Sequence, residues 1–186
     1  CMIINADKLE PLNTAIKKVQ SMSEKYKLLV QVIYALSNQL IYLLDKEKHC
    51  FYNYTMEDVI LINGGKTAFY ILPHLLKTNY SPNKNYTYMT LYNFPEHQKN
   101  EFASPELFTL STLPAKLPVS TIFWSMGMLI IRGILINMPI ENFNNINPQQ
   151  LLDQCDCIKG TRLFNMLTYC IKQNHRLRTI NWGPLK

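Results

Sequence analysis

The side chains best suited to metal or redox chemistry are five cysteines and four histidines. Cys155 and Cys157 are separated by one residue, but a structural zinc site needs a second pair of ligands at a short spacing. No second cysteine pair follows them, and none of the histidines (His49, His74, His97 and His175) stands at ligand spacing. We therefore expect no metal site. An odd number of irregularly spaced cysteines favours a reducing, intracellular compartment, most simply the cytoplasm.

Aromatic residues gather in a polar stretch at residues 77–100, where they could bind a partner. Aromatic side chains are efficient anchors of protein interfaces. The alternative is that they pack onto the domain as ordinary core residues, and the sequence favours neither interpretation. The residues concerned are Tyr80, Tyr86, Tyr88, Tyr92 and Phe94.

Composition and charge describe a globular chain with a mild positive excess. Of the 186 residues, 47% are hydrophobic and 17% are charged, and the net charge is +6. This length fits one domain over residues 1–186. Nucleic-acid binding is the least favoured hypothesis, because the lysines fall at spacings typical of a solvated helix face. Its candidate residues would be Lys17, Lys18, Lys25, Lys27, Arg176 and Arg178.

Hydrophobic periodicity predicts a mainly α fold with a small β-hairpin. Apolar residues recur every three or four positions after a Ser21–Glu24 capping box, which predicts a long buried helix reaching Asp45. Asn63-Gly-Gly65 predicts the turn of a hairpin, because Asn and Gly tolerate positive φ. Further helices are expected over 9–20, 120–137, 149–155 and 160–173, and strands over 59–62 and 66–72. Residues 77–100 are expected to form a long loop with short pieces of local structure.

The most apolar run, residues 117–138, is expected to be a core helix. It is short of a membrane span and is interrupted by Ser120, Ser125 and Gly127. We therefore expect no membrane-spanning segment.

Several strings in this order of elements resemble the C-terminal (large) lobe of a eukaryotic protein kinase. Phe102-Ala-Ser-Pro-Glu106 is similar to the Ala-Pro-Glu segment that closes a kinase activation loop. Thr121-Ile-Phe-Trp-Ser-Met-Gly127 is similar to the Ser-Asp-Val-Trp-Ser-Leu-Gly string of the central helix, and Asn174-His-Arg-Leu-Arg178 to the Asp-Pro-x-x-Arg near the end of the lobe. Met2-Ile-Ile-Asn-Ala-Asp7 is similar to the strand that leaves the kinase hinge.

The resemblance covers nearly the whole chain and implies a kinase C-lobe-like fold. It implies a structural ion pair between Glu106 and Arg178, and a core helix containing Trp124 and Gly127. The chain contains no Gly-rich phosphate loop and no Val-Ala-x-Lys strand. We therefore expect the small lobe to be absent from this chain and the chain to be a fragment of a longer protein.

The same resemblance implies that the catalytic positions are degenerate. Aligning Glu57-Asp58-Val-Ile-Leu61 with the family's Glu-Asn-Ile-Leu-Leu puts neutral Asn53 in place of the catalytic Asp and Asp58 in place of the metal-binding Asn. Ile71 then replaces the magnesium-binding Asp, and an aliphatic side chain cannot coordinate Mg²⁺. Asp58 itself is better interpreted as a turn residue than as a metal ligand.

These residues predict a pseudokinase domain that is not an enzyme and acts as a protein-protein interaction or scaffold module. We expect protein partners, no cofactor, no nucleic acid and no small-molecule ligand. The alternative is a degenerate kinase, or a nucleotide-binding pseudokinase, completed by a small lobe elsewhere.

Overall fold

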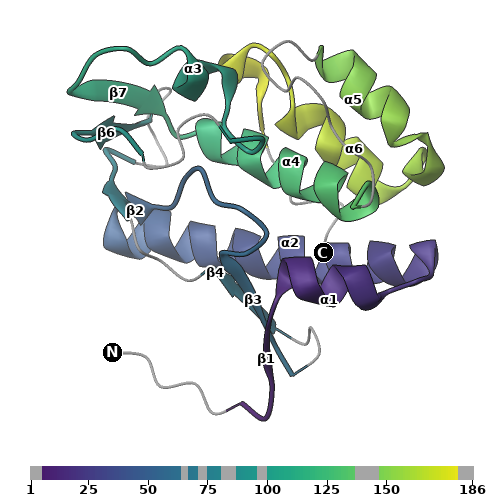
Figure 1. The fold of residues 1–186 in the computed structure, drawn as a ribbon. Coiled ribbons are helices and arrows are strands. Elements are labelled where there is room, and N and C mark those ends of the chain that lie inside the picture. The colour runs from purple at the N-terminus through teal and green to yellow at the C-terminus, as the bar shows by residue number, and fades with distance from the viewer. Residues whose placement is uncertain are drawn as a thin grey trace.

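The computed structural model describes residues 6–63, 67–70, 75–80, 87–95, 100–136 and 147–179 (Figure 1). Over these residues the protein is mainly helical, with a few short antiparallel strand pairs. The expected mainly α class with a small hairpin is therefore confirmed at this coarse level. The expected turn glycines Gly64 and Gly65, and with them Ile71, Tyr86 and residues 2–5, lie outside the described residues.

Four helices form the body of the protein. Helix α2 (Met22–Tyr42) runs along one side, and α4 (Thr121–Ile134) packs between it and α6 (Arg162–Cys170), with α5 (Pro148–Gln154) beside them (Figure 1). The predicted helices over 120–137, 149–155 and 160–173 are confirmed, each with ends shifted by a few residues. Twelve of the fourteen residues of α4 are buried, which makes it the centre of the core.

The predicted long helix is confirmed as α2, and its sequence explains both ends. The Ser21 side chain accepts a hydrogen bond from the Glu24 backbone N–H at 3.4 Å, which satisfies one free donor of the first turn. Its apolar stripe is buried, and the helix continues into a π-helical turn, Leu43–Glu47. Lys48 then ends it with a left-handed φ of 55°. The stripe comprises Leu29, Val32, Ile33, Leu36, Leu40, Leu43 and Leu44.

Glycine allows the helices to approach one another closely. A Cβ at Gly127 of α4 would lie 2.5 Å from Ile171 Cγ2 and 3.0 Å from Cys170 Cβ, at the end of α6. A Cβ at Gly133 would collide with Leu29 of α2. These contacts explain why the apolar run that forms α4 contains glycine despite its cost to helix propensity.

The largest sheet has three strands in the order β1-β3-β4, all antiparallel. The predicted hairpin is confirmed as β3 (Val59–Ile62) and β4 (Thr67–Tyr70), with Ile62 opposite Thr67. Asn63 begins the connection with a φ of 49°. The two other pairs are β2 (His49–Cys50) with β5 (Leu76–Lys77), and β6 (Tyr88–Leu91) with β7 (Ala115–Pro118).

One expectation about local structure was wrong in part, and one strand was not predicted. Residues Leu9–Pro11 form β1, and only Leu12–Lys18 form helix α1, because the backbone of Leu9–Pro11 pairs with β3. Strand β6 is one of the short pieces of local structure expected within the loop over 77–100, but its partner β7 was not predicted. Helix α3 (Pro105–Phe108) precedes β7 and is capped by Ser104.

Among the residues that the structure describes, the one helix long and apolar enough to cross a membrane is not the apolar run at 117–138. It is Met22–Glu47, with 44% of its apolar window buried in the structure. α4 is shorter and buried on nearly all sides. Because the buried face of Met22–Glu47 packs in the core, its length and composition are weak evidence for a span.

Candidate functional site

The loop at residues 51–58 contains two of the positions that the sequence analysis singled out. Phe51 and Tyr54 are fully buried and stack edge to face with ring centroids 5.3 Å apart, which anchors the loop to the core. Asn53 lies between them with a left-handed φ of 49°, a conformation that Asn tolerates better than most residues. The Asp58 Oδ2 accepts hydrogen bonds from the Thr55 backbone N–H at 2.7 Å and from the Thr55 hydroxyl at 3.0 Å. Asp58 is thus engaged in a turn.

A polar cluster that the sequence analysis did not find lies beside this loop. Arg132 Nε donates a hydrogen bond to Glu101 Oε1 at 3.0 Å, and Asn13 Nδ2 donates to Glu57 Oε1 at 2.5 Å. The four residues line a small cavity of about 150 Å³. Burial raises the pKa of the Glu101 carboxyl, Arg132 opposes that rise, and the charge of Glu57 adds to it. The available signal was Arg132, a cation in an otherwise apolar helix.

Glu106 and Arg178 form a bidentate ion pair between α3 and the segment that follows α6. Arg178 Nη1 lies 2.5 Å from Glu106 Oε1, and Nη2 lies 3.0 Å from Oε2. The Arg178 side chain is fully buried, and its remaining donors reach the carbonyls of Lys172 and Gln173 at 2.6 and 3.1 Å. Its guanidinium also lies 4.9 Å from the ring centroid of Trp124 in α4, so one side chain joins three segments.

The Glu106 carboxylate is held in its charged form. Burial raises the pKa of this carboxyl, but the hydrogen bonds and charge of Arg178 outweigh burial, helped by the Thr121 hydroxyl at 2.8 Å. The pKa of the Glu106 carboxyl therefore lies below its ordinary value of 4.5. The pair is therefore ionised at neutral pH, and it ties α3 to α4 and to the segment that follows α6.

A groove with a volume of about 560 Å³ lies between the C-terminal end of α2 and the start of α4. Its apolar walls are Leu40, Ile41 and Leu44 from α2 and the π-helical turn, with Val119 and Phe123 facing them. Tyr80 and Thr87 flank one side, and the short 3₁₀ helix η4 (His175–Leu177) and Arg178 bound another. Among the described residues that line the groove, none belongs to the loop at 51–58.

The described residues that line the groove carry a net positive charge. Arg176 and His175 line it, whereas no Asp or Glu is found among its described lining residues. Arg178 contributes no net charge to the groove, because Glu106 neutralises it. Lys48 Nζ lies 5.6 Å from the ring centroid of Tyr80, whose hydroxyl is hydrogen-bonded to Asp45, so two opposite charges lie together at this end.

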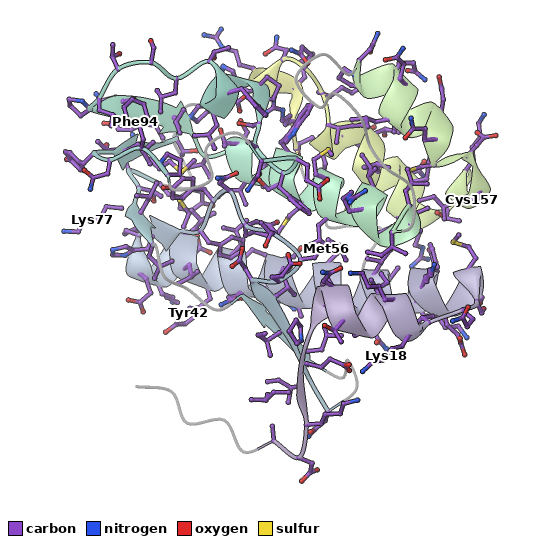
Figure 2. All side chains as sticks on the ribbon, viewed as in Figure 1. Lys18, Tyr42, Met56, Lys77, Phe94 and Cys157 are labelled. Atoms are coloured by element: carbon purple, nitrogen blue, oxygen red, sulfur yellow. The ribbon has the colours of Figure 1, made fainter. Side chains whose placement is uncertain are left out.

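The four aromatic residues of the 77–100 stretch that the structure describes divide into two pairs. Tyr80 and Tyr88 are half-buried, Tyr80 against the core and Tyr88 beneath Lys116 Nζ, 4.7 Å from its ring centroid. Tyr92 and Phe94 are 71% and 47% exposed. Phe94 lies on the surface beside β6 (Figure 2). The structure therefore contains both a packed pair and an exposed pair.

No protein-family model matches this chain, and no curated protein matches it.

The structure brings together some of the singled-out residues and separates others. Glu106, Arg178 and Trp124 meet, and Gly127 lies one turn along α4 from Trp124. Asn53 and Asp58 share one loop, away from the groove. Arg178 is buried and paired, so it cannot contact a nucleic acid as the least favoured hypothesis required.

The part of the chain that the structure describes contains no cluster of side chains that could bind a metal ion. No three His, Cys, Asp or Glu side chains there lie together as a metal site would need. Cys155 is buried and Cys157 is exposed. The two thiols therefore lie in different environments.

Proposed function

We propose that this chain is a non-catalytic, kinase-like large lobe that functions by binding other proteins. The order of α2, the 51–58 loop, the β3–β4 hairpin, α3 and α4 supports the resemblance to that lobe. The Glu106–Arg178 ion pair supports it further, because the resemblance implied this pair between residues 72 positions apart.

The absence of catalysis is proposed from the chemistry of two positions. A phosphoryl-transfer site needs a carboxylate to accept the substrate's hydroxyl proton and another to hold Mg²⁺. Asn53 carries a neutral amide that cannot act as this base, and Ile71 has no oxygen ligand. The remaining carboxylate, Asp58, accepts two hydrogen bonds from Thr55.

The observation that carries the binding function is the groove. Its volume of about 560 Å³ falls within the range of roughly 300–1,000 Å³ that binding sites commonly have. Ile41 at its edge is 39% exposed, and Tyr92 and Phe94 add exposed aromatic surface on the stretch that follows Tyr80. Exposed apolar surface of this kind commonly marks interaction sites.

A thermal-shift titration with ATP and Mg²⁺ tests the non-catalytic part of the proposal. We expect no change in melting temperature. A nucleotide present at 100 times its dissociation constant would add ~2.7 kcal/mol to the free energy of unfolding. That corresponds to a rise of roughly 5–10 °C for a chain of this length. A metal-dependent rise of this size would favour the nucleotide-binding alternative instead.

Quantitative affinity capture with matched surface variants tests the binding part. Ile41→Glu places a charge at the groove, whereas Leu9→Glu changes a similarly apolar residue, 60% exposed on β1. We expect partners retained by the wild type and by Leu9→Glu to be lost with Ile41→Glu. A Tyr92→Ser/Phe94→Ser variant tests the aromatic stretch separately. If capture is the same with all these variants, neither surface is the binding site.

A further inference from the structure

We propose that the groove binds a short segment of a partner protein that combines large apolar side chains with Asp or Glu. This inference rests on the proposed binding function and specifies the chemistry of the partner.

The apolar part of the proposal follows from the groove's walls. Leu40 and Leu44 are buried behind it, while Ile41 and Phe123 keep part of their surface open to the groove. Covering such surface with an apolar side chain removes it from water and stabilises the complex. Leu177, 61% exposed on η4, extends the same character beside Arg176.

The acidic part follows from the cations. Arg176 is exposed on η4, where the Asn174 side chain accepts a hydrogen bond from its backbone N–H at 3.0 Å and holds the turn. The rim of the groove carries Arg176, which lines it, and Lys48, whose Nζ lies 5.6 Å from the ring centroid of the lining residue Tyr80. Asp45, which is hydrogen-bonded to the Tyr80 hydroxyl, offsets the charge of Lys48, so Arg176 supplies the net positive charge of this rim. A partner carboxylate would therefore meet complementary charge at this rim.

The extent of the apolar surface favours a protein segment over a small amphiphilic carboxylate. Tyr34 and Ile41 lie seven residues apart on α2, which places them on one face about 10.5 Å apart, and they are 49% and 39% exposed. Tyr34 is thus a second exposed apolar side chain on the face of Ile41, with polar Asn38 exposed between the two. A protein segment several residues long can cover both the groove and Tyr34, whereas a ligand confined to the groove would leave Tyr34 exposed.

The test is selection of short random peptides displayed on phage against the purified chain. Enriched peptides are then synthesised with a fluorescent label and titrated against wild type, Arg176→Glu, Ile41→Ser and the control Leu9→Ser. Circular dichroism and melting temperature verify that each variant is folded. A parallel thermal-shift titration uses dodecanoate, a small carboxylate with an apolar tail.

The proposal expects enriched peptides rich in Leu or Phe together with Asp or Glu. Their affinity should fall at least roughly fivefold with Arg176→Glu, because the rim charge is reversed, and should fall with added salt. Ile41→Ser should also lower the affinity of the enriched peptides, and Leu9→Ser should leave it unchanged.

Three other outcomes overturn the inference. Basic or uncharged peptides that still depend on Ile41 would refute the acidic partner while leaving the proposed binding function intact. Peptides indifferent to both groove variants, or no enrichment at all, would refute the groove as a binding site and with it the proposed function. A shift with dodecanoate without peptide binding would assign the groove to a small molecule.

Discussion

Replacing Glu106 by Gln would leave the Arg178 guanidinium buried without a negative partner. The Arg178 side chain is fully buried, and its two contacts with Glu106 lie at 2.5 and 3.0 Å. The substituted amide would fill the same space and could accept one hydrogen bond, but it carries no charge. The change therefore isolates the electrostatic contribution of the pair from its packing.

The expected cost is large compared with ordinary surface changes. Removing one partner of a buried ion pair costs about 3–5 kcal/mol, because the remaining charge is left uncompensated in a poorly solvated site. The Glu106 side chain is 18% exposed, so water can partly replace it and the lower end applies. With a urea m-value of roughly 2–3 kcal/mol/M, a loss of ~3 kcal/mol lowers the unfolding midpoint by about 1–1.5 M.

Urea unfolding at neutral pH, followed by tryptophan fluorescence and circular dichroism, measures this cost. Arg176→Gln is the matched control, since this arginine is two residues away and exposed, and its free energy of unfolding should change by less than ~0.5 kcal/mol. Should Glu106→Gln fail to fold, Arg178→Lys offers a milder perturbation that keeps the charge and loses the bidentate geometry. The Glu106→Gln/Arg178→Met double variant should cost less than the sum of its single variants.

The pH dependence supplies an independent check with a defined sign. Because the folded-state pKa of Glu106 lies below 4.5, its contribution is complete above that pH and is lost as the pH falls through the folded-state pKa. The stability difference between wild type and Glu106→Gln should therefore shrink on acidification. An unchanged urea midpoint in Glu106→Gln at neutral pH, or a difference that grows in acid, would refute the electrostatic reasoning.

Three further predictions concern packing, thiol reactivity and the degenerate loop. Gly127→Ala should lower the free energy of unfolding by about 1–3 kcal/mol, because its Cβ would meet Ile171 Cγ2, and Ile171→Ala in the same chain should recover part of that loss in urea titrations. Asp58→Ala should cost ~1–2 kcal/mol through its two lost hydrogen bonds with Thr55, and Asp58→Asn less; equal midpoints for all three proteins would contradict the turn assignment. Peptide mapping after iodoacetamide treatment should find exposed Cys157 alkylated in the folded protein, and slow alkylation at the thiols whose pKa burial raises to about 12; fast alkylation there would contradict their burial. Those thiols are Cys50, Cys155 and Cys170.

Long helices were predictable from the sequence because their signal is local and repeated. The stripe from Leu29 to Leu44 returns to one face every three or four residues, so each residue reinforces the same prediction. Capping residues such as Ser21 act within one helical turn and are equally visible. Hairpin β3–β4 was predictable for a related reason, since its two strands flank the short sequence Asn63-Gly-Gly65.

Short strands and the charged clusters depended on contacts between distant segments. Strand β2 has only two residues and exists because β5 lies beside it, so it has no periodic signal of its own. The pairing of Glu101 with Arg132 joins residues 31 positions apart, and nothing in either local sequence identifies the other. Sequence resemblance, rather than any local pattern, suggested that Glu106 and Arg178 would meet.

Sequence alone determined which faces of the helices are apolar and which residue types stand at the aligned catalytic positions, because both depend on residue identity or on neighbours within a few positions. Tertiary structure decided that Ile41, Phe123 and Arg176 border one groove. These residues lie on three elements far apart in the chain, and only the packing of α4 against α2 brings them together. A surface made by such packing has no counterpart in local periodicity.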